Sequence, residues 1–342
     1  MHDKNVFILG AGFGAEGGAP LLRDFLQTAQ RLLVNPTSRL SKDERDLFTR
    51  VFNHRYELAA AREAIEVDLD NIEHLFGLLD LEATIDSRKR QFRDDLVYVI
   101  LRTLELSIDW VRVDDERRSP VRLFARHLRP IDAVLTFNYD LQLDQQVSRC
   151  GQSLDYCLAD DDGGKRAPGP NSIKALKLHG SANWFQCTNC SKTTVVDHTS
   201  SPMDAFVSDR VRRSCEHCHH AGVLRPTIVP PGWRKPGIDK DDILVPVWRT
   251  AVEELREAQR LVIIGYSMPE SDIFFRYLLA LGVNMRSIDR VVLIDPDHAV
   301  DARYQRLFDE VFRSHRFHYS DTRCRDSFAG IAQNWLNRSA AS

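Results

Sequence analysis

The chain has 342 residues and a net charge of −3, with 46 basic against 49 acidic side chains. This balance gives no strong field for nucleic acids, so no direct nucleic-acid binding is expected. No apolar run is long enough to span a membrane, and the polar start MHDKN is not a signal peptide, so a cytoplasmic location is expected. The seven cysteines are then expected to be metal ligands or core residues rather than disulfides.

The first predicted element is a buried strand over residues 5–9 that ends in the glycine-rich run GAGFGAEGG. Pro20 is expected to open the following helix, where its missing N–H is not needed. Glycines let the backbone come close to a phosphate, and free N–H groups at a helix start attract anions. The stretch therefore predicts a nucleotide site, with a dinucleotide as the ligand. A purely structural glycine turn is the alternative.

Four more buried strands follow along the chain, and their long connections predict an open parallel α/β sheet wound with helices. They are expected at residues 131–136, 174–178, 261–265 and 291–295. Between the first two strands, residues 31–128 are expected to form a helical insertion. Two apolar stripes of helical spacing support this prediction: Ile65, Leu69, Ile72, Phe76 and Leu79, and then Leu96, Val99, Ile100 and Leu104.

The strongest metal signal is a pair of CxxC motifs, at Cys187, Cys190, Cys215 and Cys218. Each motif places two thiolates on one turn, and two such turns complete a tetrahedral Zn²⁺ site. Because four protein ligands leave no open position for water, the zinc is expected to be structural. A nearby histidine could replace one cysteine, the candidates being His217, His219 and His220.

Polar side chains follow the predicted strands, at the edge where open α/β sheets bind ligands. Asn138 and Asp140 follow one strand, and His179 follows the next. Asparagine is poorly suited to a strand, whereas it can hold a hydroxyl or a water. A neutral histidine can relay a proton near pH 7. Two later strands bring further residues to the same edge: Gly265, Ser267 and Asp295, the last well placed for ribose hydroxyls.

Taken in order, these motifs resemble the sirtuin family: GAG with a proline eight residues on, then TxNxD, HGS, the two CxxC pairs and GxS. The resemblance runs from residue 6 to about 296, and the helical insertion has no counterpart in ordinary sirtuins. It implies a Rossmann-like NAD⁺-binding domain with a zinc ribbon. The expected division is 1–30, 129–180 and 224–342 for NAD⁺ binding, 31–128 for the helical insertion and 181–223 for the zinc ribbon.

The resemblance also implies roles for individual residues. Asn138 and His179 would be catalytic, with His179 as the general base, and Asp140 would line the nicotinamide pocket beside Asn138. Gly265 and Ser267 would hold the adenosine half. The first turn would contact the phosphates and ribose through Gly10, Ala11, Gly12, Gly14, Pro20 and Arg23.

The sequence differs from sirtuin motifs at positions that indicate which sirtuin activity to expect. Gly14 stands where sirtuins usually have serine. Pro230 and Pro231 stand where deacylating sirtuins pair with an acyl-lysine peptide, and proline has no N–H for such pairing. The run GYSMPESD and the insertion instead resemble the sirtuin-like domains of prokaryotic antiphage defence systems, which hydrolyse NAD⁺ with water.

The expected function is therefore NAD⁺ hydrolysis to nicotinamide and ADP-ribose, as an effector of antiphage defence by NAD⁺ depletion. NAD⁺-dependent protein-lysine deacylation is the alternative, and a non-catalytic NAD⁺ or ADP-ribose sensor is a third. Because a freely active hydrolase would deplete its cell, the insertion is expected to control it, with its apolar stripes packed between subunits or against a partner. Burial of the stripes against the chain's own sheet is the alternative. A homo-oligomer is expected, and the resemblance implies a separately encoded partner such as a nucleic-acid-handling ATPase.

Overall fold

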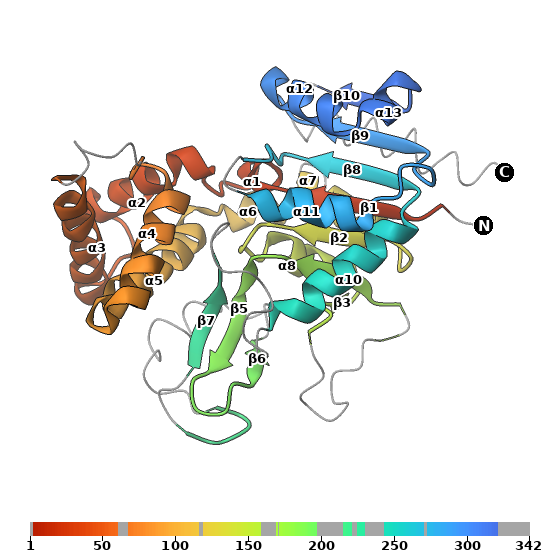
Figure 1. The fold of residues 1–342 in the computed structure, drawn as a ribbon. Coiled ribbons are helices and arrows are strands. Elements are labelled where there is room, and N and C mark those ends of the chain that lie inside the picture. Colours follow the sequence, from red (N-terminus) through yellow and green to blue (C-terminus); the bar gives the residue numbers. More distant parts are fainter. Residues whose placement is uncertain are drawn as a thin grey trace.

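The structure is a computed structural model that describes most of the chain. It covers residues 3–60, 68–115, 119–158, 169, 171–196, 215–220, 224–229, 243–269 and 272–320. These residues form a large sheet wound with helices, a group of helices beside it and a small second sheet (Figure 1). Within these ranges no helix has the length and apolarity needed to cross a membrane.

The large sheet has seven parallel strands in the order β10-β9-β8-β1-β2-β4-β3. The predicted open parallel sheet is confirmed, and all five predicted strands lie close to their expected bounds. The short edge strands β3 and β10 were not predicted. The strands are β1 (Asn5–Leu9), β2 (Ala133–Thr136), β3 (Leu154–Asp155), β4 (Ile173–Lys177), β8 (Arg260–Ile264), β9 (Arg290–Ile294) and β10 (Phe317–Ser320).

Helices cover both faces of this sheet because its inner strands are apolar on both sides. Val6 and Ile8 of β1 pack in one core, whereas Phe7 and Leu9 pack in the other. The first core lies under α10 (Leu244–Glu257), α11 (Ile273–Gly282), α12 (His298–Leu307) and α13 (Asp309–Arg313). The second lies under α1 (Ala11–Ala15), α7 (Pro120–His127) and α8 (Gln142–Arg149).

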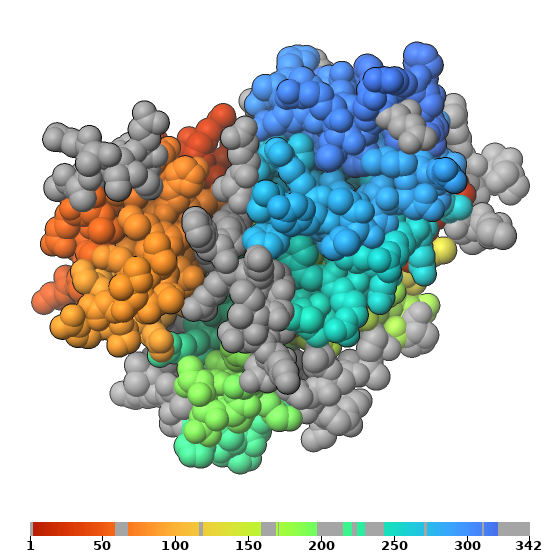
Figure 2. Space-filling view, viewed as in Figure 1, coloured from red at the N-terminus to blue at the C-terminus, as the bar shows by residue number. Residues whose placement is uncertain are grey.

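The helical unit is a bundle with its own core around a central helix, α5. It comprises η1 (Leu22–Asp24), α2 (Phe25–Val34), α3 (Lys42–Ala60), α4 (Ile72–Ile85), η3 (Ser87–Lys89), α5 (Arg90–Ser107) and α6 (Trp110–Val113). The described members of the two apolar stripes predicted for the insertion, from Leu69 on, are buried in this core. They are therefore not free surfaces for a partner. In the space-filling view the unit, in orange, lies beside the blue and cyan helices of the large sheet (Figure 2).

The helix start predicted at Pro20 is wrong, and the first apolar stripe does not lie on a single helix. Pro20 does not open a helix: α1 begins directly after Gly10, and the next α-helix begins at Phe25, after η1. The chain turns away at Gly18, which has a φ of +95° that favours glycine. In the first stripe, the side chain of Asn71 accepts a hydrogen bond from the Glu73 N–H at 2.9 Å and so starts α4 at Ile72.

Leu69 therefore lies before α4, yet it is buried in the core of the helical unit. Apolar spacing alone could not distinguish this position from one more turn of helix. Ile65 and the proline pair Pro230 and Pro231 lie outside the described residues.

The second sheet is antiparallel, in the order β6-β5-β7. Its strands are β5 (Gly180–Cys187), β6 (Thr193–Val195) and β7 (Leu224–Ile228). Ala182, Phe185 and Ile228 from this sheet join the core of the helical unit. The second sheet thus connects the large sheet, through the start of β5, to the bundle.

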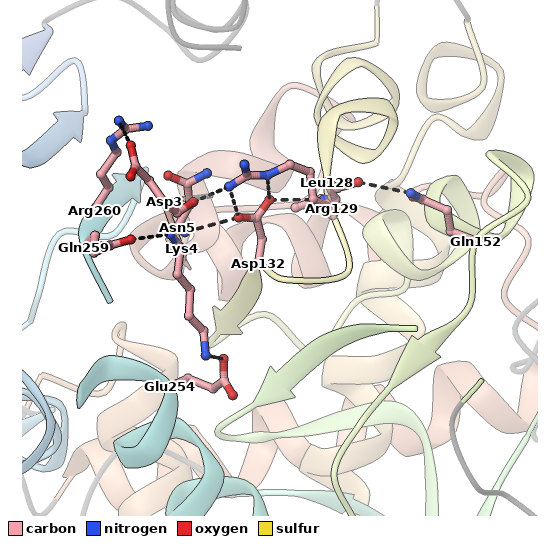
Figure 3. A network of polar contacts seen from close by, with 10 residues as sticks. All are labelled: Asp3, Lys4, Asn5, Leu128, Arg129, Asp132, Gln152, Glu254, Gln259 and Arg260. Carbon is pink, nitrogen blue, oxygen red and sulfur yellow. Dashed lines mark hydrogen bonds and ion pairs between the residues drawn. The ribbon is translucent and has the colours of Figure 1, made fainter. Parts of the chain in front are cut away.

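Polar contacts fix the amino-terminal edge of the large sheet (Figure 3). Asp132 is 1% exposed and accepts hydrogen bonds from the Asn5 N–H at 3.2 Å and from the Arg129 side chain at 2.7 Å. Hydrogen bonds from Arg129 to Asp132 raise the pKa of the guanidinium. Lys4 forms an ion pair with Glu254 at 2.7 Å. These contacts hold the start of β1 between its neighbours.

Candidate active site

A cavity of about 460 Å³ lies at the opposite, carboxyl-terminal edge, between the large sheet and the helical unit. Its size falls within the usual range for small-molecule sites, about 300–1,000 Å³. Most site residues predicted from the sequence line it: Ala11, Gly12, Pro20, Arg23, Asn138, Asp140, His179, Gly265, Ser267 and Asp295. The turns after β1, β2, β4, β8 and β9 thus meet at one place.

Gly10 and Gly14 are not among the lining residues and support the cavity from behind. The Asn138 side-chain amide donates to the Gly10 carbonyl at 3.0 Å, and the Gln142 amide donates to the Gly14 carbonyl at 3.1 Å. A Cβ at Gly14 would lie 2.9 Å from that Gln142 amide and 3.3 Å from the Asp140 carboxylate. Glycine at this position therefore leaves room for the residues that follow β2.

The glycines after β1 allow two strand-end turns to touch. A Cβ on Gly10 would lie 2.5 Å from the Gly265 carbonyl oxygen, and one on Gly12 would lie 2.8 Å from the Gly265 Cα. The N–H groups of Gly10, Gly12 and Phe13 donate to protein carbonyls at 3.0, 2.9 and 3.0 Å. The expectation of a set of free N–H groups in this turn is therefore wrong for these three. Close backbone packing is what makes glycine necessary here.

His179 lies where the chain passes from the large sheet to the second sheet. Gly180 makes this junction possible: it has a φ of +85°, and a Cβ there would lie 2.1 Å from the Thr227 carbonyl oxygen. The His179 carbonyl accepts from the Val229 N–H at 2.9 Å. The sequence HG thus places a histidine on a backbone that is held on both sides.

The His179 ring is 8% exposed and packs edge-on against Phe137, with ring centres 5.0 Å apart. Burial lowers the pKa of His179, and the nearby Asp272 carboxylate opposes this effect. His179 is therefore neutral near pH 7, which is the form that can accept a proton.

Asp272 is a site residue that the sequence analysis missed. It is 1% exposed, and its Oδ2 lies 3.8 Å from His179 Nε2. The Tyr266 hydroxyl donates to the same Oδ2, and the Phe275 N–H donates to Oδ1 at 3.3 Å, because Asp272 is the N-cap of α11. Sequence alone indicated a helix cap at most, since nothing in the motif links this residue to the histidine.

Asn138 is fixed by two hydrogen bonds, one from its backbone and one from its side-chain amide. Its backbone N–H donates to Thr136 Oγ1 at 3.1 Å, and its Nδ2 donates to the Gly10 carbonyl. Its Oδ1 accepts no hydrogen bond from the part of the chain that the structure describes. Because Asn138 lines the cavity, this oxygen can accept from a hydroxyl or a water.

Asp140 lies above a buried lysine. Lys177 is 1% exposed, and its ammonium donates to the Asp140 carbonyl at 2.8 Å and to Ser181 Oγ at 2.8 Å, and pairs with Asp144 at 3.0 Å. With two hydrogen bonds donated and its charge paired with Asp144, Lys177 supports the floor of the site rather than acting as a nucleophile. Burial raises the pKa of the Asp140 carboxyl, although the Gln142 N–H hydrogen-bonds to it at 2.9 Å.

The helical unit supplies the other wall of the cavity, and Glu73 is its most buried acidic residue there, at 8% exposed. Glu73 lies in the first turn of α4, and its charge raises the pKa of Tyr139, after the larger effect of burial. The apolar spacing assigned residues 65–79 to the core, so Glu73 was not predicted as a site residue. The other acidic lining residues are Asp68, Asp70, Asp140, Asp272, Asp295 and Asp297, so the walls favour positive charge near them.

The four predicted metal ligands form a cluster at one end of the second sheet. Their sulfur atoms lie within 4.8 Å of one another: Cys187, Cys190, Cys215 and Cys218. Cys187 and Cys218 sulfurs are 3.6 Å apart, and Cys190 and Cys215 sulfurs are 3.7 Å apart. A tetrahedral zinc with Zn–S bonds of about 2.3 Å requires sulfurs about 3.8 Å apart. The two measured separations are close to this value, so the four cysteines fit a tetrahedral zinc ion.

Backbone N–H groups orient these thiolates in two matching turns. The Asn189 N–H points to Cys187 Sγ and the His217 N–H to Cys215 Sγ, each at 3.4 Å. His220 contacts the Cys218 carbonyl through Nδ1 at 3.0 Å. The described cluster is complete with four sulfurs, so no histidine is needed in place of a cysteine.

Comparisons with known proteins find likeness only among solved structures. No family model and no curated protein matches the chain. A Sir2 homologue in complex with NAD is 16% identical, with 99% of this chain and 91% of that chain covered, at a TM-score of 0.45. A mutant Sir2 homologue with ADP-ribose is 14% identical, with 99% and 94% covered and a TM-score of 0.45.

A structure described as the basis for the mechanism and regulation of Sir2 enzymes is 15% identical, with 97% and 92% covered and a TM-score of 0.44. Likenesses of this size do not assign an activity to this chain.

Proposed function

We propose that this chain hydrolyses NAD⁺ in the cavity, giving nicotinamide and ADP-ribose. One observation carries the proposal: Asn138 and His179, which follow two neighbouring strands, line the same cavity with Asp140. Their motifs, TxNxD and HGS, are those that resemble sirtuins. A neutral base and an amide oxygen beside one small-molecule cavity suit water attack on a sugar carbon.

The reaction breaks the bond between the anomeric carbon and the nicotinamide nitrogen, and the bond electrons leave with nicotinamide. The ribose becomes oxocarbenium-like and positive, which the acidic walls of the cavity stabilise. Water forms the new C–O bond, and neutral His179 accepts its proton, directly or through a ribose hydroxyl. Asn138 Oδ1 orients that water or hydroxyl. The imidazolium then releases the proton to solvent.

The remaining lining residues fit the other parts of the dinucleotide. Arg23 is the lining arginine, with a side chain 80% exposed, and it would meet the diphosphate beside Ala11 and Gly12. Gly265 and Ser267 would hold the adenosine half. Asp295, 7% exposed at the end of β9, would accept hydrogen bonds from ribose hydroxyls. A structural zinc on the four cysteines would hold the second sheet together and take no part in the reaction.

Hydrolysis is preferred to protein deacylation because the expected peptide-pairing segment contains two prolines, Pro230 and Pro231, which lack N–H groups. One observation keeps deacylation as the second candidate. β7 is an edge strand of the second sheet, and an extended peptide can add to such an edge. The two activities differ in whether NAD⁺ is consumed without a peptide.

The test is purified full-length chain incubated with NAD⁺, with nicotinamide and ADP-ribose measured by chromatography, with and without an acetylated peptide. We expect both products without peptide. His179→Ala should lower turnover by about 100-fold or more. His74→Ala is the matched control, since His74 is exposed on α4 and does not line the cavity. Product formation only with the peptide would favour deacylation, and no product in either case would overturn the proposal.

We also propose that the chain acts as a homo-oligomer in antiphage defence by NAD⁺ depletion, with a separately encoded partner such as a nucleic-acid-handling ATPase. The buried stripes of the helical unit cannot form the subunit contact. Exposed apolar side chains on α11 lie four residues apart and offer a continuous face instead: Ile273, Tyr277 and Leu281. Light scattering should show more than one chain per particle, and Tyr277→Asp should reduce this mass.

A further inference from the structure

Asp272 and His179 come from different elements and meet at the cavity. Asp272 is the N-cap of α11, whereas His179 follows β4. Their Oδ2 and Nε2 atoms lie 3.8 Å apart, and the two side chains are 1% and 10% exposed. Such separations often shorten to hydrogen bonds when a substrate fills the site. Because both side chains are buried, the pair is surrounded by little water, and a charge there interacts strongly with its neighbour.

The carboxylate is held in place independently of the histidine. The Tyr266 hydroxyl donates to Oδ2 and the Phe275 N–H donates to Oδ1. The ring of Tyr266 stacks on Phe137 at 4.2 Å, and Phe137 packs on His179. Asp272 is thus fixed by α11 and by the aromatic residues that also surround the imidazole.

We propose that Asp272 is the positioning residue of this site: it holds His179 with a proton on Nε2 and stabilises the imidazolium that forms during turnover. This inference rests on the proposed function for its kinetic consequence, but not for its effect on His179 itself. With Nε2 protonated, Nδ1 is the nitrogen that accepts the proton from water or a ribose hydroxyl. The proton then leaves from the imidazolium to solvent, so Asp272 is unchanged over the cycle.

The electrostatic surroundings of His179 give Asp272 this role. Burial lowers the pKa of His179, and Asp272 raises it. The titratable groups around the pair include Tyr139 after β2, Tyr266 after β8, Tyr304 on α12 and Glu73 in the first turn of α4. The three tyrosines are neutral, because burial raises their pKa values. Asp272 is the carboxylate with a direct contact to the imidazole within the described residues.

The experiment is an NMR titration of the His179 imidazole in full-length wild type and Asp272→Asn, with no substrate present. Asparagine is as good an N-cap as aspartate, so α11 should keep its start. We expect the pKa of His179 to fall in Asp272→Asn, because the opposing negative charge is lost and burial remains. The signals of exposed His74 serve as the internal control for a native fold. An equal or higher pKa of His179 would overturn the proposal.

A second variant tests the opposite direction and covers poor folding of the first. Tyr266→Phe removes the hydroxyl that donates to Asp272, so the carboxylate acts more fully on His179 and its pKa should rise. No rise in this variant would also count against the proposal. In NAD⁺ turnover, Asp272→Asn should lower kcat by about 10- to 100-fold, with KM little changed and the acid limb of the pH profile moved to lower pH.

These readouts separate this inference from the proposed function. If the titrations behave as expected but no NAD⁺ is cleaved, the pairing is correct and the proposed reaction is wrong. If NAD⁺ is cleaved and His179 titrates identically in wild type and Asp272→Asn, the reaction is correct and the role of Asp272 is wrong.

Discussion

Asp132 and His179 are both buried polar residues next to strands of one sheet, yet their surroundings differ. At the amino-terminal edge, the Asp132 carboxylate accepts hydrogen bonds from Asn5 and Arg129. At the carboxyl-terminal edge, the His179 ring accepts and donates no hydrogen bond within the described residues, and its nearest charge lies 3.8 Å away. Buried polar groups usually have hydrogen-bond partners. A buried polar group that lacks one and lies beside a cavity therefore indicates a ligand-binding site.

Removing the zinc proposed for the four cysteines should have the largest effect and should act on one edge first. Cys215→Ser leaves three sulfurs, and structural zinc contributes on the order of 10 kcal/mol to folding. We expect loss of bound zinc and unfolding of the second sheet, measured by metal analysis and hydrogen exchange. Since β5 starts next to His179, exchange should rise there before it rises at Asp132. Equal protection at both edges would contradict this coupling.

Asp132→Ala should destabilise the chain by about 3 kcal/mol, because it removes one partner of a buried ion pair and leaves Arg129 unpaired. Chemical denaturation measures this free energy of unfolding. Glu257→Ala is the control, since Glu257 pairs with Lys4 but is 69% exposed, and exposed pairs contribute less than about 1 kcal/mol. Turnover per folded molecule should stay at the wild-type value. A lower value would mean that the amino-terminal edge also affects the reaction, against the proposed difference between the two edges.

Asn138→Ala should have the opposite effect to Asp132→Ala: a large loss of turnover and a small loss of stability. We expect turnover of NAD⁺ to fall by about 100-fold, because Oδ1 no longer orients the nucleophile or ribose, whereas the free energy of unfolding should change by about 1 kcal/mol at most for the lost bond to Gly10. Asn35→Ala, at an exposed turn, is the control. A large loss of stability with normal turnover would assign Asn138 a structural role.

Arg23→Ala should raise KM for NAD⁺ several-fold with little change in kcat, because an exposed arginine contributes binding rather than chemistry. Steady-state kinetics at low salt measures the effect most clearly. Arg31→Ala, exposed on α2, is the control. An unchanged KM would place the diphosphate elsewhere in the cavity.

The smallest expected effect is on the pH profile of the wild type. Burial lowers the pKa of His179 below its ordinary 6.5, so the base stays neutral as the pH falls through 6.5. The acid limb of kcat/KM, which reports the free enzyme, should therefore lie below pH 6.5. A limb above that value would mean that another group, or a substrate-induced change, controls the acid side.

The sequence predicted the parts of the site that local patterns encode. Apolar runs marked the strands, and polar residues directly after them, such as Asn138 and His179, line the cavity as expected. Glu73 and Asp272 were missed because their place depends on packing between distant elements. Two local features were not predicted either: the start of α4 after Asn71 and the turn at Gly18. A side-chain cap and a positive φ act against the helix that apolar periodicity suggests.

The contact between the turns after β1 and β8 limits how this protein can vary. A Cβ on Gly265 would lie 2.6 Å from backbone atoms of Gly12, and a Cβ on Gly10 would lie 2.5 Å from the Gly265 carbonyl. Each of these clashes is with main chain, so no change of side-chain rotamer relieves it. In a library of random variants selected only for folding, these positions should return as glycine as often as in one selected for turnover.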